Sequence, residues 1–228
     1  VVESTNRLII ALDDMDLAGA LRAADPLRPT GCILKVNDAS FADGFNHVLP
    51  ELSVYGRVMI DLKLHDIPNT VANTCRKIAP HNPWAVTVHG SGGVEMMKAA
   101  VSALRGVQTK VLVITVLTSL KDECRDIYHR RPLAQVLKIA AKVREAGAHG
   151  LVCAPEEVRH LRKDFPDFEL VTPGIRPAGE AQGDQKRVAT PIQAIRNGSN
   201  YLVMGRPILQ APDPVERVRE IMTEINAG

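Results

Sequence analysis

Two aspartates and a lysine lie within six residues of one another in the segment IDLKLHDIPNT, which runs from Ile60 to Thr70. Asp61 and Lys63 are two residues apart, and Asp66 follows three residues later. The segment opens on an apolar run typical of a buried strand, where an unpaired charge is costly. Residues i and i+2 of a strand point to the same face, so we expect Asp61 and Lys63 to enter one pocket. Alternating charges would keep the ammonium group protonated there, as electrostatic stabilisation of negative charge requires.

The strand that positions this cluster is one of eight apolar runs. The runs cover residues 7–13, 31–36, 57–64, 84–90, 110–117, 149–154, 168–175 and 200–207. They are rich in Val, Ile and Leu without strict alternation, which is typical of parallel strands buried on both faces. Helical segments are expected between them, at residues 68–79, 133–147, 154–165, 190–198 and 213–225.

This alternation predicts an α/β fold, a single (β/α)8 TIM barrel that forms one catalytic domain over residues 1–228. A doubly wound sheet is the alternative. That fold normally has a glycine-rich turn after its first strand, and the segment LDDMDL has none.

Polar residues stand where the predicted strands end. They are Asp13, Lys35, Asp61, Lys63, His89, Thr118, Arg176 and Arg206, and Gly205 stands beside Arg206. TIM-barrel active sites lie at the carboxyl ends of the strands, so Lys35 should reach the pocket that holds Asp61 and Lys63. The alternative is a structural ion-pair network, which we regard as less favoured because buried ion pairs add little stability. His89 suits a structural role as well as a functional one.

The last two strands end in the segments TPGIRP and MGRPI. Barrels often build a phosphate site from these two loops. Glycine lets backbone N–H groups approach an anion, and arginine offers a planar fork of donors. A simple Gly-Arg-Pro turn is the alternative for each segment taken alone.

Composition excludes several classes of protein. Apolar residues make up 45% of the chain and the net charge is +2, so neither a disordered chain nor a nucleic-acid-binding or membrane-binding face is expected. The start of the chain has no basic segment, and no apolar run is long enough for a bilayer, so neither a signal peptide nor a span is expected. The four cysteines have no zinc-site spacing, and together these features predict a cytoplasmic protein with reduced thiols and no metal site.

The segment DLKLHDIPNT closely resembles the signature of orotidine 5′-monophosphate decarboxylases, Asp-x-Lys-x-x-Asp-Ile-Pro-x-Thr. The segments RLIIALD, ILKV, VTVHGSGG, ITVLTS, VTPGIRP, GDQKR and VMGRPI resemble that family in the same order along nearly the whole chain. The resemblance implies conversion of orotidine 5′-monophosphate to uridine 5′-monophosphate and CO2, the last step of de novo pyrimidine synthesis. It also implies an enzyme without cofactor or metal.

The resemblance further implies a role for each matching residue. Catalysis would fall to the network of Lys35, Asp61, Lys63 and Asp66, in which Lys63 stabilises and protonates the C6 carbanion. Asp13 and Lys35 would contact the ribose, Asp61 would lie near the departing carboxylate, and Thr118 would hold the pyrimidine. Phosphate binding would use Arg176, Gln185, Gly205 and Arg206. Asp66 and Thr70 would reach into the active site of a second subunit of a homodimer.

The sequence shows one departure from the family pattern and one segment that could be a lid. Asn37 stands where the family usually has glycine, although asparagine tolerates left-handed backbone better than most residues. The segment RPAGEAQGDQKR, residues 176–187, is predicted to be a mobile lid that includes Gln185, with a passive surface loop as the alternative.

Two other functions fit the same barrel. Magnesium-dependent sugar-phosphate relatives, the 3-keto-gulonate phosphate decarboxylases and hexulose phosphate synthases, share Asp-x-Lys-x-x-Asp but place an acid near the end of the second strand, where this chain has Lys35. A catalytically silent nucleotide-binding barrel is the other alternative, and Asn37 is the only sign of it.

Overall fold

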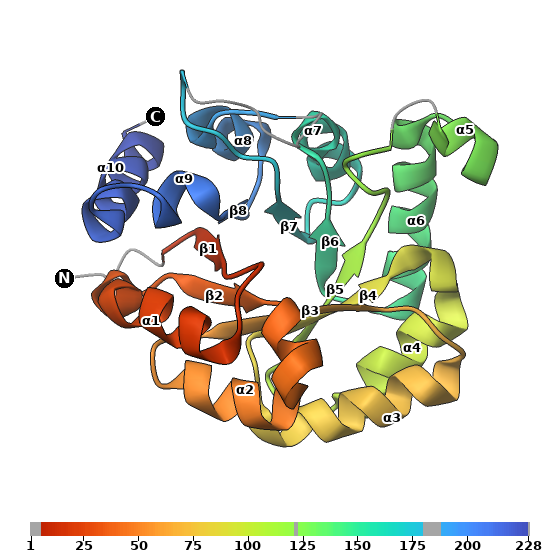
Figure 1. The fold of residues 1–228 in the computed structure, drawn as a ribbon. Helices are drawn as coiled ribbons and strands as arrows, with labels where there is room; N and C mark the ends of the chain where they lie inside the picture. The colour runs from red at the N-terminus through yellow and green to blue at the C-terminus, as the bar shows by residue number, and fades with distance from the viewer. Residues whose placement is uncertain (1–5, 121–122, 180–187, 228) are drawn as a thin grey trace.

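The computed structural model describes residues 6–120, 123–179 and 188–227, and its strands form a closed barrel (Figure 1). The strands are β1 (Leu8–Ala11), β2 (Ile33–Val36), β3 (Val58–Leu64), β4 (Ala85–His89), β5 (Lys110–Ile114), β6 (Gly150–Val152), β7 (Glu169–Thr172) and β8 (Tyr201–Met204). Each strand pairs in parallel with the next, and β8 pairs with β1 to close the ring. The predicted TIM barrel is confirmed, and each predicted apolar run contains one of these strands.

Helices lie outside the barrel and cover its strands (Figure 1). They are α1 (Leu17–Leu27), α2 (Phe45–Ser53), α3 (Pro68–Ile78), α4 (Val94–Ala103), α5 (Glu123–Tyr128), α6 (Pro132–Ala146), α7 (Pro155–Asp164), α8 (Pro191–Asn197), α9 (Arg206–Leu209) and α10 (Pro214–Asn226). The predicted helical segments are confirmed as α3, α6, α7, α8 and α10, to within one residue at each end. In the described parts of the chain, no helix has the length and apolar character needed to cross a bilayer.

Besides the short helices α5 and α9, helices α1, α2 and α4 were not predicted from the sequence. The side chain of Asp16 caps α1 by accepting a hydrogen bond from the Gly19 N–H at 2.7 Å, but Pro26 lies inside the helix. Pro50 lies inside α2 in the same way. Proline normally marks the end of a helical pattern, so both segments look interrupted. Helix α4 follows Gly93 at φ +87° and has no side-chain cap, so no start signal precedes it.

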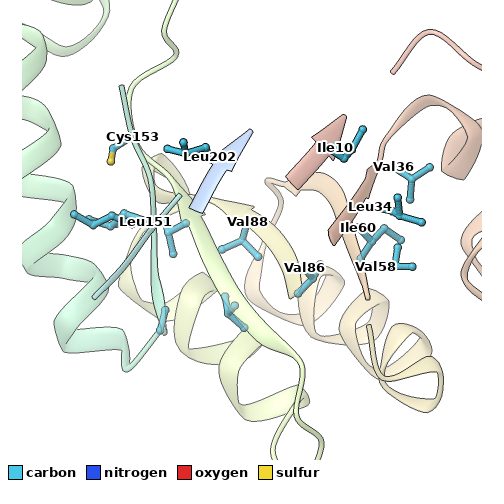
Figure 2. Packing of buried hydrophobic residues seen from close by; sticks show 14 of the residues in the cluster. Ile10, Leu34, Val36, Val58, Ile60, Val86, Val88, Leu151, Cys153 and Leu202 are labelled. Atoms are coloured by element: carbon cyan, nitrogen blue, oxygen red, sulfur yellow. The ribbon is translucent and has the colours of Figure 1, made fainter. Parts of the chain in front are cut away.

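Residues along each strand alternate between two cores. Ile9, Ile33, Met59, Ala85, Leu112 and Val171 fill the inside of the barrel. Their neighbours point outward and pack under the helices, as Figure 2 shows for Ile10, Leu34, Ile60 and Val86. Lys35 and Asp61 come two residues after Ile33 and Met59, so the alternation turns both side chains toward the barrel interior.

The amino end of the barrel is filled by aromatic and charged side chains. The rings of Trp84 and Tyr201 meet edge to face, with centroids 4.8 Å apart. The ammonium group of Lys110 lies 5.3 Å from the centroid of the Trp84 ring and also pairs with Glu169. This layer occupies the amino end, so the carboxyl end of the barrel is left for binding.

Replacing Leu34 by alanine should lower the free energy of unfolding by about 2–5 kcal/mol, because Leu34 is almost fully buried between β2 and the helices. Urea unfolding at a fixed protein concentration measures the change. The control is Val54→Ala, at a side chain that is 59% exposed, which should change the free energy by less than about 0.5 kcal/mol. Equal losses in the two variants would contradict the packing described above.

Candidate active site

A cavity of about 730 Å³ opens at the carboxyl ends of the strands. The side chains or backbone of these residues, all predicted from the sequence, line it: Asp13, Lys35, Asp61, Lys63, Thr118, Arg176, Gly205 and Arg206. They come from β2 and β3 and from the segments that follow β1, β5, β7 and β8. The barrel therefore brings together groups that are almost two hundred residues apart in the sequence.

Four charged side chains at one side of this cavity form a continuous network in which Asp61 is central. The Oδ2 atom of Asp61 lies 2.9 Å from Lys63 Nζ and 3.3 Å from Lys35 Nζ. Lys35 Nζ also donates to Asp13 Oδ1 at 2.5 Å. Only 8% of the Lys35 side chain is exposed, against 38% of the Lys63 side chain. Lys35 thus serves as a buried bridge, and Lys63 presents its ammonium group to the cavity.

The electrostatic environment keeps the buried members of this network charged. Burial by itself would lower the pKa of Lys35, but the negative charges of Asp61 and then Asp13 outweigh it and raise that pKa. Burial would likewise raise the pKa of Asp61, and the charges of Lys35 and Lys63 outweigh it and lower that pKa. Both groups are therefore ionised at neutral pH, as the sequence predicted for alternating charges.

Strand β3 is irregular where it carries the network. Ile60 pairs with Val86 and Leu64 pairs with Val88, so Asp61, Leu62 and Lys63 stand opposite a single residue of β4, Thr87. Lys63 adopts φ +49°, a left-handed conformation that is uncommon for lysine. The i, i+2 rule predicted correctly that both charges enter one pocket, but a bulge, not a regular strand, directs Lys63.

The other walls of the cavity offer different chemistry. Apolar side chains of the barrel wall line one part, namely Met59, Ile114, Val116, Val152 and Val203, and they suit a flat ring. The segments after β7 and β8 contribute Gly174, Arg176, Gly205 and Arg206. A Cβ atom on Gly205 would lie 3.2 Å from the backbone oxygen of Ala11, so glycine lets the end of β8 lie close to β1 here. The arginines give this end of the cavity the positive charge that an anion requires.

Some predicted site residues lie away from the cavity. Asp66 and Thr70 are exposed, and Asp66 Oδ1 accepts a hydrogen bond from the Ile67 N–H at 2.6 Å. Neither residue lines the cavity of its own chain. Gln185 and most of the predicted lid lie outside the described residues. No cluster of three or more metal-binding side chains occurs in the segments 6–120, 123–179 and 188–227.

The sequence left the roles of His89 and Asn37 open. His89 ends β4 but does not line the cavity; its Nδ1 lies 2.7 Å from Ser91 Oγ, and its ring lies against His65. Burial and then the charge of His65 lower the pKa of His89.

Asn37 does not have a positive φ, so its backbone conformation does not require glycine. The departure from the family pattern at this position therefore imposes no strain.

Replacing Asp61 by asparagine should destabilise the protein at neutral pH, and the difference from wild type should vanish in acid. The folded-state pKa of Asp61 is lowered, so its contribution is present above the unfolded pKa of about 4 and is lost as the pH falls through the folded value. A protonated Asp61 then resembles asparagine. Urea unfolding of both proteins from pH 3 to pH 8 measures this, and a pH-independent difference would refute the charge network.

Comparison with known proteins agrees with this geometry. The family profile described as "Orotidine 5'-phosphate decarboxylase / HUMPS family" matches residues 6–221. The orotidine 5′-phosphate decarboxylase of Actinobacillus succinogenes is 44% identical over 223 residues, which cover 95% of this chain and 96% of that protein. The protein of the same name from Haemophilus influenzae strain Rd is 45% identical over 228 residues, covering 97% and 99%.

A solved structure shows the same likeness in three dimensions. The crystal structure of orotidine 5′-phosphate decarboxylase from Lactobacillus acidophilus superposes with a TM-score of 0.84 at 34% identity, covering 97% of this chain and 99% of that one. The match extends over the entire barrel and is not confined to a motif. On the profile match, the sequence identity and the shared fold, this chain belongs to the orotidine 5′-phosphate decarboxylase family.

Proposed function

We propose that this protein converts orotidine 5′-monophosphate to uridine 5′-monophosphate and CO2, the last step of de novo UMP synthesis. The observation that carries the proposal is a single cavity with an ammonium group at one side and two arginines at its edge, in a chain of this family. The ammonium group is that of Lys63, and the arginines are Arg176 and Arg206. Apolar residues between them suit the pyrimidine ring.

The chemistry depends on stabilising negative charge at one carbon atom. When the bond between C6 and the carboxylate breaks, its electron pair stays on C6, which has no neighbouring group that can accept it. Lys63 is the exposed ammonium of the network. Its Nζ donates to Asp61 Oδ2 at 2.9 Å and to the Asp61 backbone oxygen at 3.4 Å, and its third N–H remains for a bound molecule. Lys63 stabilises the carbanion and then transfers a proton from Nζ to C6. Solvent afterwards returns a proton to the amine.

The fixed charges around Lys63 are in place before the reaction begins. Asp61 is only 6% exposed and is held by Lys35 on one side and Lys63 on the other. Such a preorganised arrangement does not have to reorient when charge develops, which is the main source of electrostatic catalysis. In the proposed complex, Asp61 lies near the departing carboxylate, and Asp13 and Lys35 contact the ribose.

The phosphate end of the cavity supplies binding energy to the reacting end. Arg176, Gly205 and Arg206 would bind the phosphate, and Thr118 would hold the pyrimidine. A group that does not react can still accelerate the reaction when its binding orients the reacting atoms. Gln185 completes the phosphate site in this proposal.

We also propose that the active protein is a homodimer. Asp66 and Thr70 are exposed, and the apolar side chain of Ile67 between them is 66% exposed. A second subunit packed on this surface would cover Ile67 and would bring Asp66 and Thr70 to its neighbour's cavity. The network of Asp13, Lys35, Asp61 and Lys63 would then gain a further negative charge from the partner.

The position of Lys35 argues against the magnesium-dependent sugar-phosphate enzymes. Those relatives place an acid near the end of the second strand, and here the end of β2 carries a lysine that pairs with Asp13 and Asp61. A silent nucleotide-binding barrel would have no need of a buried lysine bridge. Turnover and its sensitivity to EDTA separate the three functions.

Purified protein should remove the ultraviolet absorbance of the orotate ring of orotidine 5′-monophosphate, at a rate that EDTA does not change. Loss of the rate in EDTA that Mg²⁺ restores would favour the metal-dependent relatives. Binding of uridine 5′-monophosphate without any turnover of the substrate would make the protein a silent barrel.

Lys63→Ala should abolish this turnover and leave binding of uridine 5′-monophosphate within about tenfold of wild type, because the phosphate and ribose contacts remain. Lys98→Ala is the matched control, since Lys98 is a surface lysine paired with Glu95 and should leave turnover unchanged. Turnover and calorimetric binding are measured on all three proteins. Normal turnover by Lys63→Ala would refute the role of Lys63.

Mixing two inactive variants, Lys63→Ala and Asp66→Asn, should restore activity if Asp66 acts across the dimer. A mixed dimer then has one site with both substitutions and one intact site, so random exchange of subunits should give about one quarter of wild-type activity. Each variant alone is the control. Activity that stays at the level of the separate variants after subunit exchange would place Asp66 outside the partner's site.

A further inference from the structure

Thr87 is a buried polar residue of the barrel wall that faces the bulge in β3. Its exposed fraction is 0%, and it lies two residues after Ala85, whose side chain points into the barrel. It is also the one residue of β4 that stands opposite the three residues between Ile60 and Leu64. Thr87 is thus placed where the regular pairing of β3 and β4 is interrupted.

The hydroxyl group of Thr87 makes two hydrogen bonds to the charge network. It donates to Asp61 Oδ1 at 2.7 Å and accepts the backbone N–H of Lys63 at 2.9 Å. A hydroxyl has one proton to donate and lone pairs to accept, so one group of this size satisfies both partners. A valine of the same shape would satisfy neither.

The first of these bonds assigns different roles to the two oxygens of Asp61. Oδ1 receives the Thr87 hydroxyl, and Oδ2 receives both Lys35 and Lys63. Without a donor at Oδ1, rotation of the carboxylate would redistribute the ammonium groups over both oxygens. The bond therefore fixes the plane of the carboxylate and with it the position of Lys63 Nζ.

The second bond supports the uncommon backbone conformation of Lys63. A non-glycine residue at φ +49° persists only where its surroundings hold it. The Lys63 N–H points to Thr87 Oγ1 at a place where the strand pairing is irregular, so the side chain replaces a backbone acceptor. Thr87 therefore holds Lys63 at its backbone and, through Asp61, at its side chain.

We propose that Thr87 is a positioning residue for the decarboxylation, acting on Lys63 through Asp61 and through the Lys63 backbone. This inference rests on the proposed function. Thr87, a neutral residue of the neighbouring strand β4, would thus orient the proton donor Lys63 although it does not itself line the cavity.

The test compares Thr87→Val, which removes the hydroxyl at constant shape, with Thr87→Ser, which keeps it. For Thr87→Val, kcat should fall about 10- to 100-fold, as when an outer partner of a catalytic group is removed. KM should change little, because the phosphate and ribose contacts remain. Thr87→Ser should recover most of the lost kcat.

The pH profile gives a readout that a purely structural residue would not change. Burial would raise the pKa of Asp61, but the charges of Lys35 and Lys63 outweigh it and lower that pKa. The hydrogen bond from the Thr87 hydroxyl lowers it further. Its removal should therefore move the acid limb of the kcat profile of Thr87→Val to higher pH. The profile of Thr87→Ser should coincide with that of wild type.

Thr172→Val is the matched control for loss of a buried threonine hydroxyl. Thr172 on β7 is 0% exposed, its Oγ1 lies 2.7 Å from Ser199 Oγ, and it is not part of the cavity lining. This variant should lose stability but keep the kcat and the pH profile of wild type. If Thr172→Val lowered kcat as much as Thr87→Val, loss of stability would explain both and the inference would be overturned.

The remaining outcomes separate this inference from the proposed function. Wild-type protein without turnover would refute the proposed function and the inference together. Active wild type with an equally active Thr87→Val variant would overturn the inference alone, as would a serine variant as slow as the valine variant. Should Thr87→Val not fold, the smaller Thr87→Ala takes its place against Thr87→Ser, and equal kcat values in that pair would also overturn the inference.

Discussion

The buried carboxylate of Asp61 is the charge on which the cavity depends. Removed from water, it would be unfavourable alone, and so would the ammonium group of Lys35 beside it. Each makes the other tolerable, and the shifts of their two pKa values in opposite directions record this. Lys63 carries the ammonium group of the network that is open to the cavity. The Lys63 ammonium group thus neutralises Asp61 and is also available to a bound molecule.

The barrel makes this arrangement possible because each strand serves two cores. Outward residues such as Ile60 hold β3 against the helices, and inward residues such as Met59 fill the barrel below Asp61 (Figure 2). The apolar layer beneath the charges fixes the height of the cavity floor. The helices hold the strands from outside, so the site residues are carried on rigid elements and not on loops alone.

Most of the barrel and eight of the residues that line the cavity could be predicted from the sequence, because long apolar runs and polar strand ends are strong local signals. Helices α1 and α2 were missed since Pro26 and Pro50 imitate helix ends. Thr87 gave no signal, because one threonine in an apolar strand is typical of any sheet. Its importance arises from the shift in pairing with β3, which depends on two distant segments. The roles of Asp66 and Thr70 depend on a second chain and stay predictions.

The layer of Trp84, Tyr201 and Lys110 determines how molecules enter and leave the cavity. It fills the amino end, and the apolar interior lies between it and the cavity. The barrel is therefore closed at its amino end and is not a channel, so a molecule that enters at the carboxyl end must also leave there. A small gas formed at the floor would escape past the larger molecule that still occupies the opening. The order of departure would then be set by geometry, with the gas first and the nucleotide last.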